Sequence, residues 1–489
     1  MGRHRKPPAG APYHFAALLG EAISGIPEEG IAAMQEIRGE SALILGFGRE
    51  GKSVLSWLHV HYPTLRVGVA DKHIAPDLMS GETMEGTTVY NGEGYLSHLS
   101  EYDTVIRSPG ISPYLPEIVS YLASGGHMTS ATNIFFSKVT GTTIGVTGTK
   151  GKSTTSSLIA HILESVHDDV RLVGNIGRPM LDALDSATDK TVFVVELSSH
   201  QLYDCRYSPH IAVMLGIVSE HLDYYPDLVS YANAKANIVR FQTDRDLVVY
   251  NPEHTILRSF TDAAKSKKIT YSVKYHPDSF TAIHDGIAEV TIKGARTQVI
   301  TMSDVPLLGN QENVLAAITV ASLMGMSAVA IASAITPFKS LPHRLEFVGE
   351  FRGVRFYNDS LATIPQATIH ALGALGTKGT TLIAGGYDRH LDFSELGAFL
   401  RSHTVSAVIL FPDTGKKIWE AIGEVQKGSI KKFDVTTMEE AVRLAYAHTQ
   451  KGAVCVLSPG SASYNLFRDY EDRGNQFKHW VRVLGDGTV

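Results

Sequence analysis

The stretch "GVTGTKGKSTT", residues 145–155, joins an apolar run to a helical pattern and decides the fold class. Its glycines leave room for backbone N–H groups to surround a phosphate, Lys152 can reach the β- and γ-oxygens, and Ser153 can ligate Mg²⁺. The common phosphate loop has a glycine five positions before Gly151, where this chain has Val146. The stretch therefore predicts a variant phosphate loop between a strand and a helix.

The same strand-then-helix pattern continues along the chain. Runs such as "SALILGFG", "TVFVVELS", "TLIAGG" and "AVCVLSPG" alternate with helical stretches, which is typical of parallel sheets in α/β domains. A chain of 489 residues is too long for one ordinary core. We predict a mobile extension at 1–35, a Rossmann-like domain at 36–131, a central phosphate-loop α/β domain at 132–340 with a β-rich insert near 268–306, and a Rossmann-like domain at 341–489.

Composition excludes several classes of protein. The net charge of −6 gives no electrostatic footprint for nucleic acid. Two cysteines imply no disulfide framework and fit a reducing compartment, and no apolar signal core follows the basic N-terminus. Residues 313–338 carry no charge, but they are rich in Ala, Ser and Thr and are interrupted by Gly325. We expect two small-residue core helices there, no membrane span, and a cytoplasmic protein.

A second glycine cluster, Gly46, Gly48 and Gly51, follows the strand-like run "ALIL" and precedes another that ends at Asp71. This is the dinucleotide fingerprint, in which a tight turn and a helix N-terminus face anionic oxygens. Alone it leaves three readings open: a dinucleotide, another diphosphate, or a purely structural turn. Two phosphate sites in two domains argue against a simple nicotinamide dehydrogenase.

Three further side chains are candidates for metal or transfer chemistry. Glu196 ends the buried run "VFVVE", where a carboxylate beside a phosphate loop is a natural Mg²⁺ ligand, although a capping or ion-paired glutamate remains the alternative. His221 and Lys235 follow in "SEHLDYYPDLVSYANAKAN". Either residue alone would more often be structural, so their reading depends on the wider pattern.

That pattern resembles the Mur ligase family, the ATP-dependent amino-acid ligases of peptidoglycan precursor assembly. The family's loop reads G-x-T-G-T-x-G-K-S/T, as in "GVTGTKGKST". Ordered matches continue through "GNIG" (174–177), "ELSS" (196–199), "EHLD" (220–223), "YANAK" (231–235), "HRLE" (343–346) and "NDSLAT" (358–363). The tail "LSPGSASYNLFRDYEDRGNQF" (457–477) resembles most closely the glutamate-adding, MurD-type branch.

The resemblance implies a role for each matching position. Catalytic roles would fall to Lys152, His221, Lys235 and Arg344. ATP would contact Gly148, Thr149, Lys150, Gly151, Lys152, Ser153, Thr154, Asn310, Asn313, Arg344 and Asp359. Two Mg²⁺ ions would be held by Ser153, Glu196, His221 and a carbamylated Lys235. The UDP-sugar would contact Gly46, Gly48, Gly51, Asp71 and Ser108, with Asn175 near its reacting carboxylate. Glutamate would contact Thr363, Arg389, Ser463 and Tyr470.

The implied reaction joins glutamate to UDP-N-acetylmuramoyl-L-alanine. The alanine carboxylate attacks the γ-phosphate of ATP, and the amine of glutamate then displaces phosphate from the acyl phosphate. We expect a monomer and favour D-glutamate. The same reaction with L-glutamate, and a folylpolyglutamate synthetase-like ligase, remain alternatives, and a nicotinamide dehydrogenase or a regulator without turnover are more distant ones.

Several positions depart from the family pattern around the incoming amino acid. Leu361 stands where the motif N-D-S-K-A-T-N has lysine, and Arg389 stands where lysine is usual. The histidine of H-N-x-x-N is replaced by Gly309, and Lys150 occupies a position where many relatives have asparagine. These changes leave the reaction type intact and put the second substrate in doubt.

Overall fold

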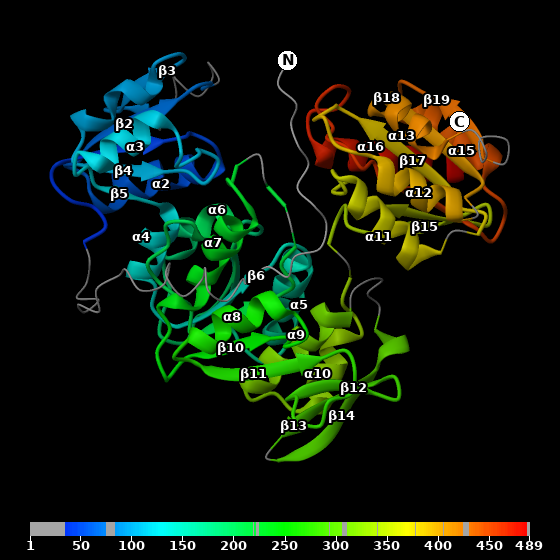
Figure 1. The fold of residues 1–489 in the computed structure, drawn as a ribbon, viewed down its shortest axis with the longest axis horizontal. Coiled ribbons are helices and arrows are strands. Elements are labelled where there is room, and N and C mark those ends of the chain that lie inside the picture. Colours follow the sequence, from blue (N-terminus) through cyan, green and yellow to red (C-terminus); the bar gives the residue numbers. More distant parts are fainter. Residues whose placement is uncertain are drawn as a thin grey trace, which may run out of the picture. The chain divides into compact units, whose positions relative to one another are not determined.

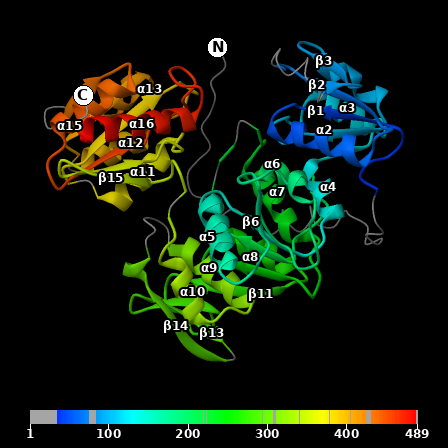
Figure 2. The same ribbon diagram turned by 180° about the vertical axis from the view of Figure 1, so that it is seen from behind.

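The computed structural model describes residues 35–74, 84–218, 220–221, 224–292, 294–305, 311–339, 341–376, 378–403, 405–423 and 430–486. All but the last residue of the predicted extension at 1–35 lies outside these ranges. The chain is a mixed α/β protein with three sheets, which confirms the predicted fold class. It forms two compact units. Figures 1 and 2 show its helices and strands from opposite sides. Unit one runs to Val299 and adds Glu312–Ile331, and unit two holds Ile300–Gln311 and continues from Ala332.

Unit one begins with a five-stranded parallel sheet in the order β3-β2-β1-β4-β5. Its strands are β1 (Ser41–Leu45), β2 (Arg66–Asp71), β3 (Thr88–Asn91), β4 (Thr104–Arg107) and β5 (Met128–Thr129). Its helices are α2 (Arg49–His61), η3 (Tyr95–Glu101) and α3 (Pro116–Ala123). Every residue of β1 is buried, as expected for a parallel strand that is covered on both faces. The order reverses between β1 and β4, and ligands bind at such a switch point in open α/β sheets.

The second sheet lies in unit one except for the last two residues of β14, and it has nine strands in the order β14-β13-β12-β11-β10-β9-β6-β8-β7. These are β6 (Thr142–Thr147), β7 (Val170–Gly174), β8 (Val192–Glu196), β9 (Ile211–Met214), β10 (Leu247–Tyr250), β11 (Lys267–Ser272), β12 (Thr281–His284), β13 (Ile287–Ile292) and β14 (Ala295–Thr301). The phosphate-loop strand β6 is central and pairs in parallel with β8 and β9. The β-rich stretch near 268–306 forms most of β11 and all of β12–β14, at one edge of this sheet.

Helices accompany this second sheet and follow several of its strands. They are α4 (Ala131–Lys138), α5 (Lys152–Glu164), η4 (Leu181–Ala183), α6 (Ser199–Leu202), α7 (Leu228–Arg240), α8 (Thr255–Ala263), η5 (Met302–Asp304), α9 (Gln311–Leu323) and α10 (Ala328–Ile335). The uncharged stretch at 313–338 thus becomes two short helices, with Gly325 between them at a φ of +87°. No helix among the described residues is long and apolar enough to cross a membrane.

Unit two contains a six-stranded sheet in the order β15-β16-β20-β17-β18-β19. Its strands are β15 (Glu346–Phe351), β16 (Val354–Asn358), β17 (Thr381–Gly386), β18 (Ala407–Asp413), β19 (Lys431–Asp434) and β20 (Val454–Leu457). Its helices are α11 (Pro365–Leu375), α12 (Ser394–Ser402), α13 (Thr414–Ile422), α15 (Met438–His448) and α16 (Tyr470–Gly485). Only β15 runs antiparallel to its neighbour. The neighbours Phe356 and Tyr357 belong to different apolar clusters, because successive strand side chains point to opposite faces.

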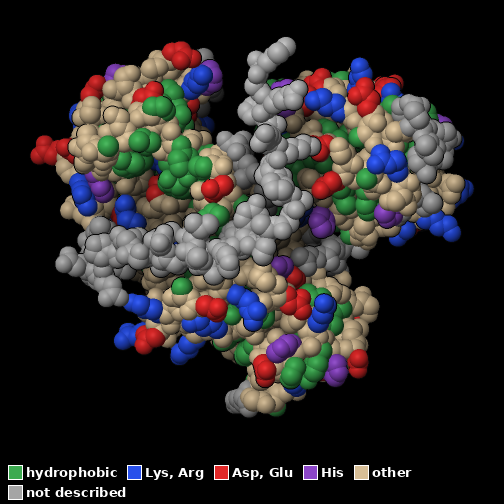
Figure 3. All heavy atoms as spheres, viewed as in Figure 1, with side chains coloured by type: hydrophobic (Ala, Val, Ile, Leu, Met, Phe, Trp, Pro, Cys, Tyr) green, Lys and Arg blue, Asp and Glu red, His purple; other side chains and the backbone are tan. Residues whose placement is uncertain are grey.

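Two predictions from composition can be compared with the structure. Cys205 and Cys455 are both free and buried, and burial raises the pKa of the Cys205 thiol to about 12. On the face drawn in Figure 3, Lys and Arg side chains are interspersed with Asp and Glu. This agrees with a chain that lacks a strongly basic composition.

Candidate active site

The phosphate loop leaves β6 and enters α5 through two glycines that no other residue could replace without strain. Gly148 has a φ of +155°, and a Cβ there would lie 2.6 Å from the Cβ of Leu215. Gly151 has a φ of +84°, and its Cβ would lie 2.3 Å from Oδ1 of Asn313. Val146 lies within β6, fully buried and paired with Glu196 and Val213. The glycine missing from the common pattern therefore falls inside a strand, where a side chain is packed.

Two lysines meet on this loop. Nζ of Lys152 donates to the carbonyl oxygens of Gly148 and Thr149, both at 3.0 Å. Nζ of Lys235, from α7, donates to the same Gly148 oxygen at 2.9 Å. Burial lowers the pKa of Lys235 well below its ordinary value and the charge of Lys152 lowers it further, although Glu220 and Glu196 act in the opposite direction. The Lys235 amine is thereby shifted toward its neutral form.

A carboxylate and an amide lie at the ends of the two neighbouring strands. Glu196, the last residue of β8, is fully buried. Nδ2 of Asn175 donates to its Oε1 at 2.8 Å, and the Asn175 backbone N–H donates to its carbonyl at 3.0 Å. Oγ of Ser156, in the first turns of α5, lies 3.5 Å from Oε2. The structure thus brings Glu196 and Asn175 together, beside the helix that the phosphate loop starts.

His221 lies just before α7 in a left-handed backbone conformation, with a φ of +58°. Its ring centroid is 4.8 Å from that of His200 and 6.1 Å from that of Tyr231. The side chain is 44% exposed, and its Nε2 lies 3.8 Å from Glu220. Among the described residues, no group of three or more His, Cys, Asp or Glu side chains is arranged to hold a metal ion.

Some residues near the loop were not predicted from the sequence. The hydroxyl of Tyr231 lies 3.0 Å from Oγ1 of Thr149, and Nζ of Lys235 lies 4.8 Å from the centroid of the Tyr231 ring. The signal for Tyr231 was its spacing four residues before Lys235, which places both on one helix face. At the start of α9, Glu312 accepts from Asn251 and pairs with His254, each at 3.0 Å. Asn310 lies outside the described residues.

The first sheet collects the predicted UDP residues at the carboxyl ends of β1, β2 and β4. Oγ of Ser108 donates to the Gly46 carbonyl at 2.8 Å, and the Phe47 N–H donates to Oδ2 of Asp71 at 2.6 Å. A Cβ on Gly51 would lie 2.2 Å from the Gly46 carbonyl oxygen, so this glycine allows α2 to pack on β1. A Cβ on Gly48 would meet nothing within 4 Å. Gly48 therefore faces open space that a ligand can enter.

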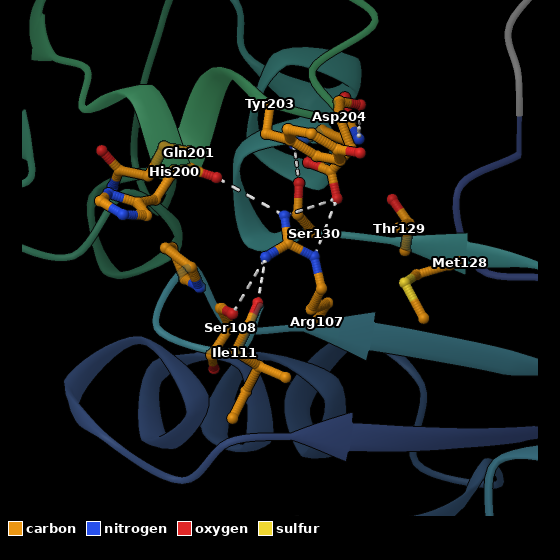
Figure 4. A network of polar contacts seen from close by, with 12 residues as sticks. Arg107, Ser108, Ile111, Met128, Thr129, Ser130, His200, Gln201, Tyr203 and Asp204 are labelled. Atoms are coloured by element: carbon orange, nitrogen blue, oxygen red, sulfur yellow. Dashed lines mark hydrogen bonds and ion pairs between the residues drawn. The ribbon is translucent and has the colours of Figure 1, made fainter. Parts of the chain in front are cut away.

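Polar contacts connect this sheet to the next one within unit one. Nη2 of Arg49, on α2, donates to the carbonyls of Gly174 and Asn175 at 2.7 and 3.2 Å. Arg107, the last residue of β4, is fully buried and pairs with Asp204 at 2.9 Å (Figure 4). Burial lowers the pKa of Arg107, but Asp204 and Tyr224 more than reverse this effect. Both arginines bind loops that carry predicted substrate residues, and neither was predicted from the sequence.

In unit two, Arg344 and Asp359 lie on adjoining turns. The Leu345 N–H donates to Oδ1 of Asp359 at 3.1 Å, and Oγ of Ser458 donates to Oδ2 at 2.8 Å. His343 and Leu345, on either side of Arg344, have φ values of +64° and +44°. Burial raises the pKa of Asp359 to about 6, although Ser458, Leu345 and Arg344 oppose this effect. The turn is therefore held by the carboxylate proposed to contact ATP.

The predicted glutamate residues come from three loops and the start of α16. Nη2 of Arg389 donates to the carbonyl of Thr363 at 3.0 Å. Ser463 is buried, and Tyr470, the first residue of α16, accepts at its carbonyl from Oγ of Ser360 at 2.8 Å.

Buried Arg473 ties two of these loops together. It donates to the Ser360 carbonyl at 2.8 Å and to the Ser461 carbonyl at 3.0 Å. No spacing pattern marks Arg473 in the sequence.

A phosphate loop on a central parallel strand, with a glycine-rich turn on a separate sheet, defines a nucleotide-binding α/β protein. Three family models match the chain in order: the Mur ligase MurD-like N-terminal domain at 40–130, the Mur ligase middle domain at 146–321, and the glutamate ligase domain at 343–460. The chain belongs to the Mur ligase family.

Similar proteins agree over most of the chain. One named UDP-N-acetylmuramoylalanine–D-glutamate ligase, from Acetivibrio thermocellus, is 33% identical over 462 residues, covering 92% of this chain and 98% of that protein. Another of the same name, from Geobacillus kaustophilus, is 35% identical over 426 residues, covering 86% and 92%. The MurF ligase structure from Thermotoga maritima in complex with ADP has a TM-score of 0.56 at 16% identity, covering 93% and 97%.

These comparisons decide between several of the expectations. The protein is an ATP-dependent ligase of this family, as predicted. The folylpolyglutamate synthetase-like alternative is not favoured, because the curated relatives carry the other name along nearly their whole length. Structural likeness at 16% identity supports the fold alone. The individual site residues and the domain limits stay predictions.

Proposed function

We propose that this protein joins D-glutamate to UDP-N-acetylmuramoyl-L-alanine, with ATP converted to ADP and phosphate. The observation that carries the proposal is the meeting of Lys152, Lys235 and the buried Glu196 around one phosphate loop. The relatives' printed name supports D-glutamate as the second substrate. The same reaction with L-glutamate remains the alternative, because Leu361 and Arg389 depart from the family pattern near the amino-acid position.

In the proposed reaction the alanine carboxylate attacks the γ-phosphate, and the amine of glutamate displaces phosphate from the acyl phosphate. Lys152 exchanges its two loop carbonyls for phosphate oxygens and offsets charge that would otherwise repel the attacking carboxylate. Asn175 orients Glu196 and lies near the reacting carboxylate. In unit two, Asp359 and Arg344 would contact ATP, while Thr363, Arg389, Ser463 and Tyr470 would contact glutamate.

We propose that Lys235 carries a carbamate and that the loop binds divalent cations. Two ammonium groups on one carbonyl repel each other, and burial together with the charge of Lys152 lowers the pKa of the Lys235 amine. A neutral amine is the form that reacts with CO₂. The product, a carbamate on Lys235, would replace the ammonium with an anionic group whose oxygens can bind a metal ion. With Ser153, Glu196 and His221 it would complete a set for two Mg²⁺ ions. When bound, Mg²⁺ supplies positive charge to the phosphate oxygens.

The remaining expectations stand as proposals of the same kind. The three domains would span 36–131, 132–340 and 341–489, with 1–35 as an extension. The enzyme would act as a monomer in the cytoplasm. The two buried free thiols fit the reducing conditions of that compartment.

The test is phosphate release from ATP with Mg²⁺ and UDP-N-acetylmuramoyl-L-alanine, with D- or L-glutamate added separately. We expect release with D-glutamate, and a loss of about two to three orders of magnitude in Lys152→Ala. Lys190→Ala, at an exposed position, is the matched control and should retain full activity. Release with neither isomer would defeat the proposal, and release with L-glutamate alone would replace its second substrate.

A further inference from the structure

The turn that follows β4 carries Ser108, which binds the first residue of the glycine-rich turn, Gly46, at 2.8 Å. Arg107 precedes this turn and closes it from inside. Its Nη1 donates to the carbonyl of Ile111 at 2.7 Å and lies 3.4 Å from the carbonyl of Ser108. The side chain is 1% exposed. The conformation of the Ser108 turn therefore depends on a buried guanidinium.

The same guanidinium binds residues that belong to the second sheet's layer. Its Nε and Nη2 donate to Oδ2 of Asp204, at 3.3 and 2.9 Å, and Nη2 lies 3.5 Å from the His200 carbonyl. Figure 4 shows Asp204 and His200 on one side of Arg107, with Ser108 and Ile111 on the other. One side chain thus connects the turn after β4 to the segment after α6.

Tyr224, just before α7, acts on the same turn from the same side. Its hydroxyl lies 3.2 Å from the Pro109 carbonyl and 3.1 Å from the Ile111 carbonyl, and it lies 3.2 Å from Nη1 of Arg107. The turn is thereby held at several carbonyls by groups that also contact the second sheet's segments. If Ser108 contacts the UDP-linked substrate, a turn held in this way would keep it in place before the substrate arrives.

The contacts need the shape of arginine as well as its charge. Its planar fork reaches Asp204 with two nitrogens while the third binds the turn, and a lysine ammonium cannot span these positions. Among the described residues, no group donates to the buried Oδ1 of Asp204. The guanidinium therefore pairs with one carboxylate oxygen of Asp204. Its other contacts are backbone carbonyls and the Tyr224 hydroxyl.

We propose that Arg107 is a positioning residue for the UDP-linked substrate: with Asp204 and Tyr224 it fixes the turn that presents Ser108. The identity of that substrate rests on the proposed function. Arg107 does not touch the phosphate loop in the described structure. Its loss should therefore weaken binding of the UDP compound and leave the affinity for ATP unchanged.

The test measures binding of UDP-N-acetylmuramoyl-L-alanine without ATP by titration calorimetry, in the full-length protein and its variants. We expect Arg107→Lys and Asp204→Asn each to weaken this binding about tenfold, the size of one lost charge-assisted hydrogen bond. The double variant should lose no more affinity for the UDP compound than the single variant that binds it less tightly, because both changes break the same connection. Arg66→Lys is the control, since Arg66 donates to the Glu101 carbonyl and lies over the Tyr102 ring, and both of these residues lie between β3 and β4.

ATP binding and thermal unfolding of each variant separate positioning from folding. An unchanged affinity for the UDP compound in Arg107→Lys would overturn the inference, whatever its melting temperature. An equal loss of UDP-compound and ATP affinity would overturn it too, because it would indicate general damage. If the wild-type protein binds the UDP compound but releases no phosphate, the proposed reaction fails while the binding series still decides on Arg107. If it binds no UDP compound, this inference fails with the substrate.

Discussion

The ammonium groups of Lys152 and Lys235 donate to one and the same oxygen, the carbonyl of Gly148, at 3.0 and 2.9 Å. Two cations that share one acceptor lie close enough to repel each other. This repulsion is relieved when one of them loses its charge. Burial and the charge of Lys152 both lower the pKa of Lys235, which favours the neutral form of its amine.

The first prediction concerns the chemistry of that neutral amine. Protein equilibrated with ¹³C-bicarbonate should show a carbamate carbon signal by NMR, and the signal should be absent in Lys235→Met. Because the variant lacks the oxygen ligand, we expect its phosphate release to fall about a hundredfold or more. Lys190→Met should keep both the signal and the activity. A carbamate signal of full size in Lys235→Met would show that another amine carries it.

The second prediction follows from the raised pKa of Asp359. Its folded-state pKa is about 6, against an ordinary value of 3.8, so the folded protein holds this proton more tightly than the unfolded chain. Its contribution is therefore fully favourable below about pH 4 and is lost as the pH rises through about 6.

Asp359→Asn should remove this loss. The difference in unfolding free energy between the variant and the wild type should shift in favour of the variant by up to about 3 kcal/mol between pH 4 and pH 7. Denaturant unfolding at the two pH values measures the difference. The same variant should bind ATP more weakly, if the carboxylate contacts the nucleotide. A difference that does not change with pH would contradict the assigned pKa.

The third prediction concerns the residue that departs from the common phosphate loop. Val146→Gly restores the standard spacing, yet Val146 is fully buried in β6. We expect no gain in ATP affinity and a loss of about 3 kcal/mol in unfolding free energy, from the emptied space and the added backbone freedom. Val166→Gly, at an exposed position beyond α5, should cost much less. Tighter ATP binding by Val146→Gly would mean that the position belongs to the loop.

The fourth prediction separates two glycines of the same turn. Gly51→Ala should destabilise the fold, because its Cβ would lie 2.2 Å from the Gly46 carbonyl oxygen. Gly48→Ala should leave the melting temperature nearly unchanged, since a Cβ there meets nothing within 4 Å. If Gly48 faces the UDP compound, the affinity of Gly48→Ala for that compound should nevertheless fall about tenfold or more. Equal melting temperatures and affinities in both variants would refute the assignment.

Residues that act through local sequence were predictable. The strand–loop–helix at 145–155 and the glycine turn at 46–51 follow from backbone rules, and Glu196 follows from its place at the end of a buried strand. The family resemblance supplied what spacing alone did not, including Lys235.

The rest depends on contacts between distant segments. Arg473 binds mainly carbonyls, and Arg107 binds three carbonyls besides Asp204 and Tyr224. Every residue possesses a carbonyl, so no residue pattern marks these partners. The shared acceptor of Lys152 and Lys235 likewise exists only once α7 packs on β6. Such arrangements arise from tertiary packing and leave no periodic signal.

The contact between Gly151 and Asn313 has a consequence for the newborn chain. The phosphate loop is made early in synthesis, but the side chain that fills the space beside Gly151 arrives with α9, after every strand from β6 to β14. On a ribosome, the sheet can thus be complete while the residue that lies beside Gly151 of the phosphate loop is still untranslated. If Asn313 contacts ATP, tight nucleotide binding would become possible only late in synthesis, and a prematurely terminated product ending before Asn313 would lack that contact.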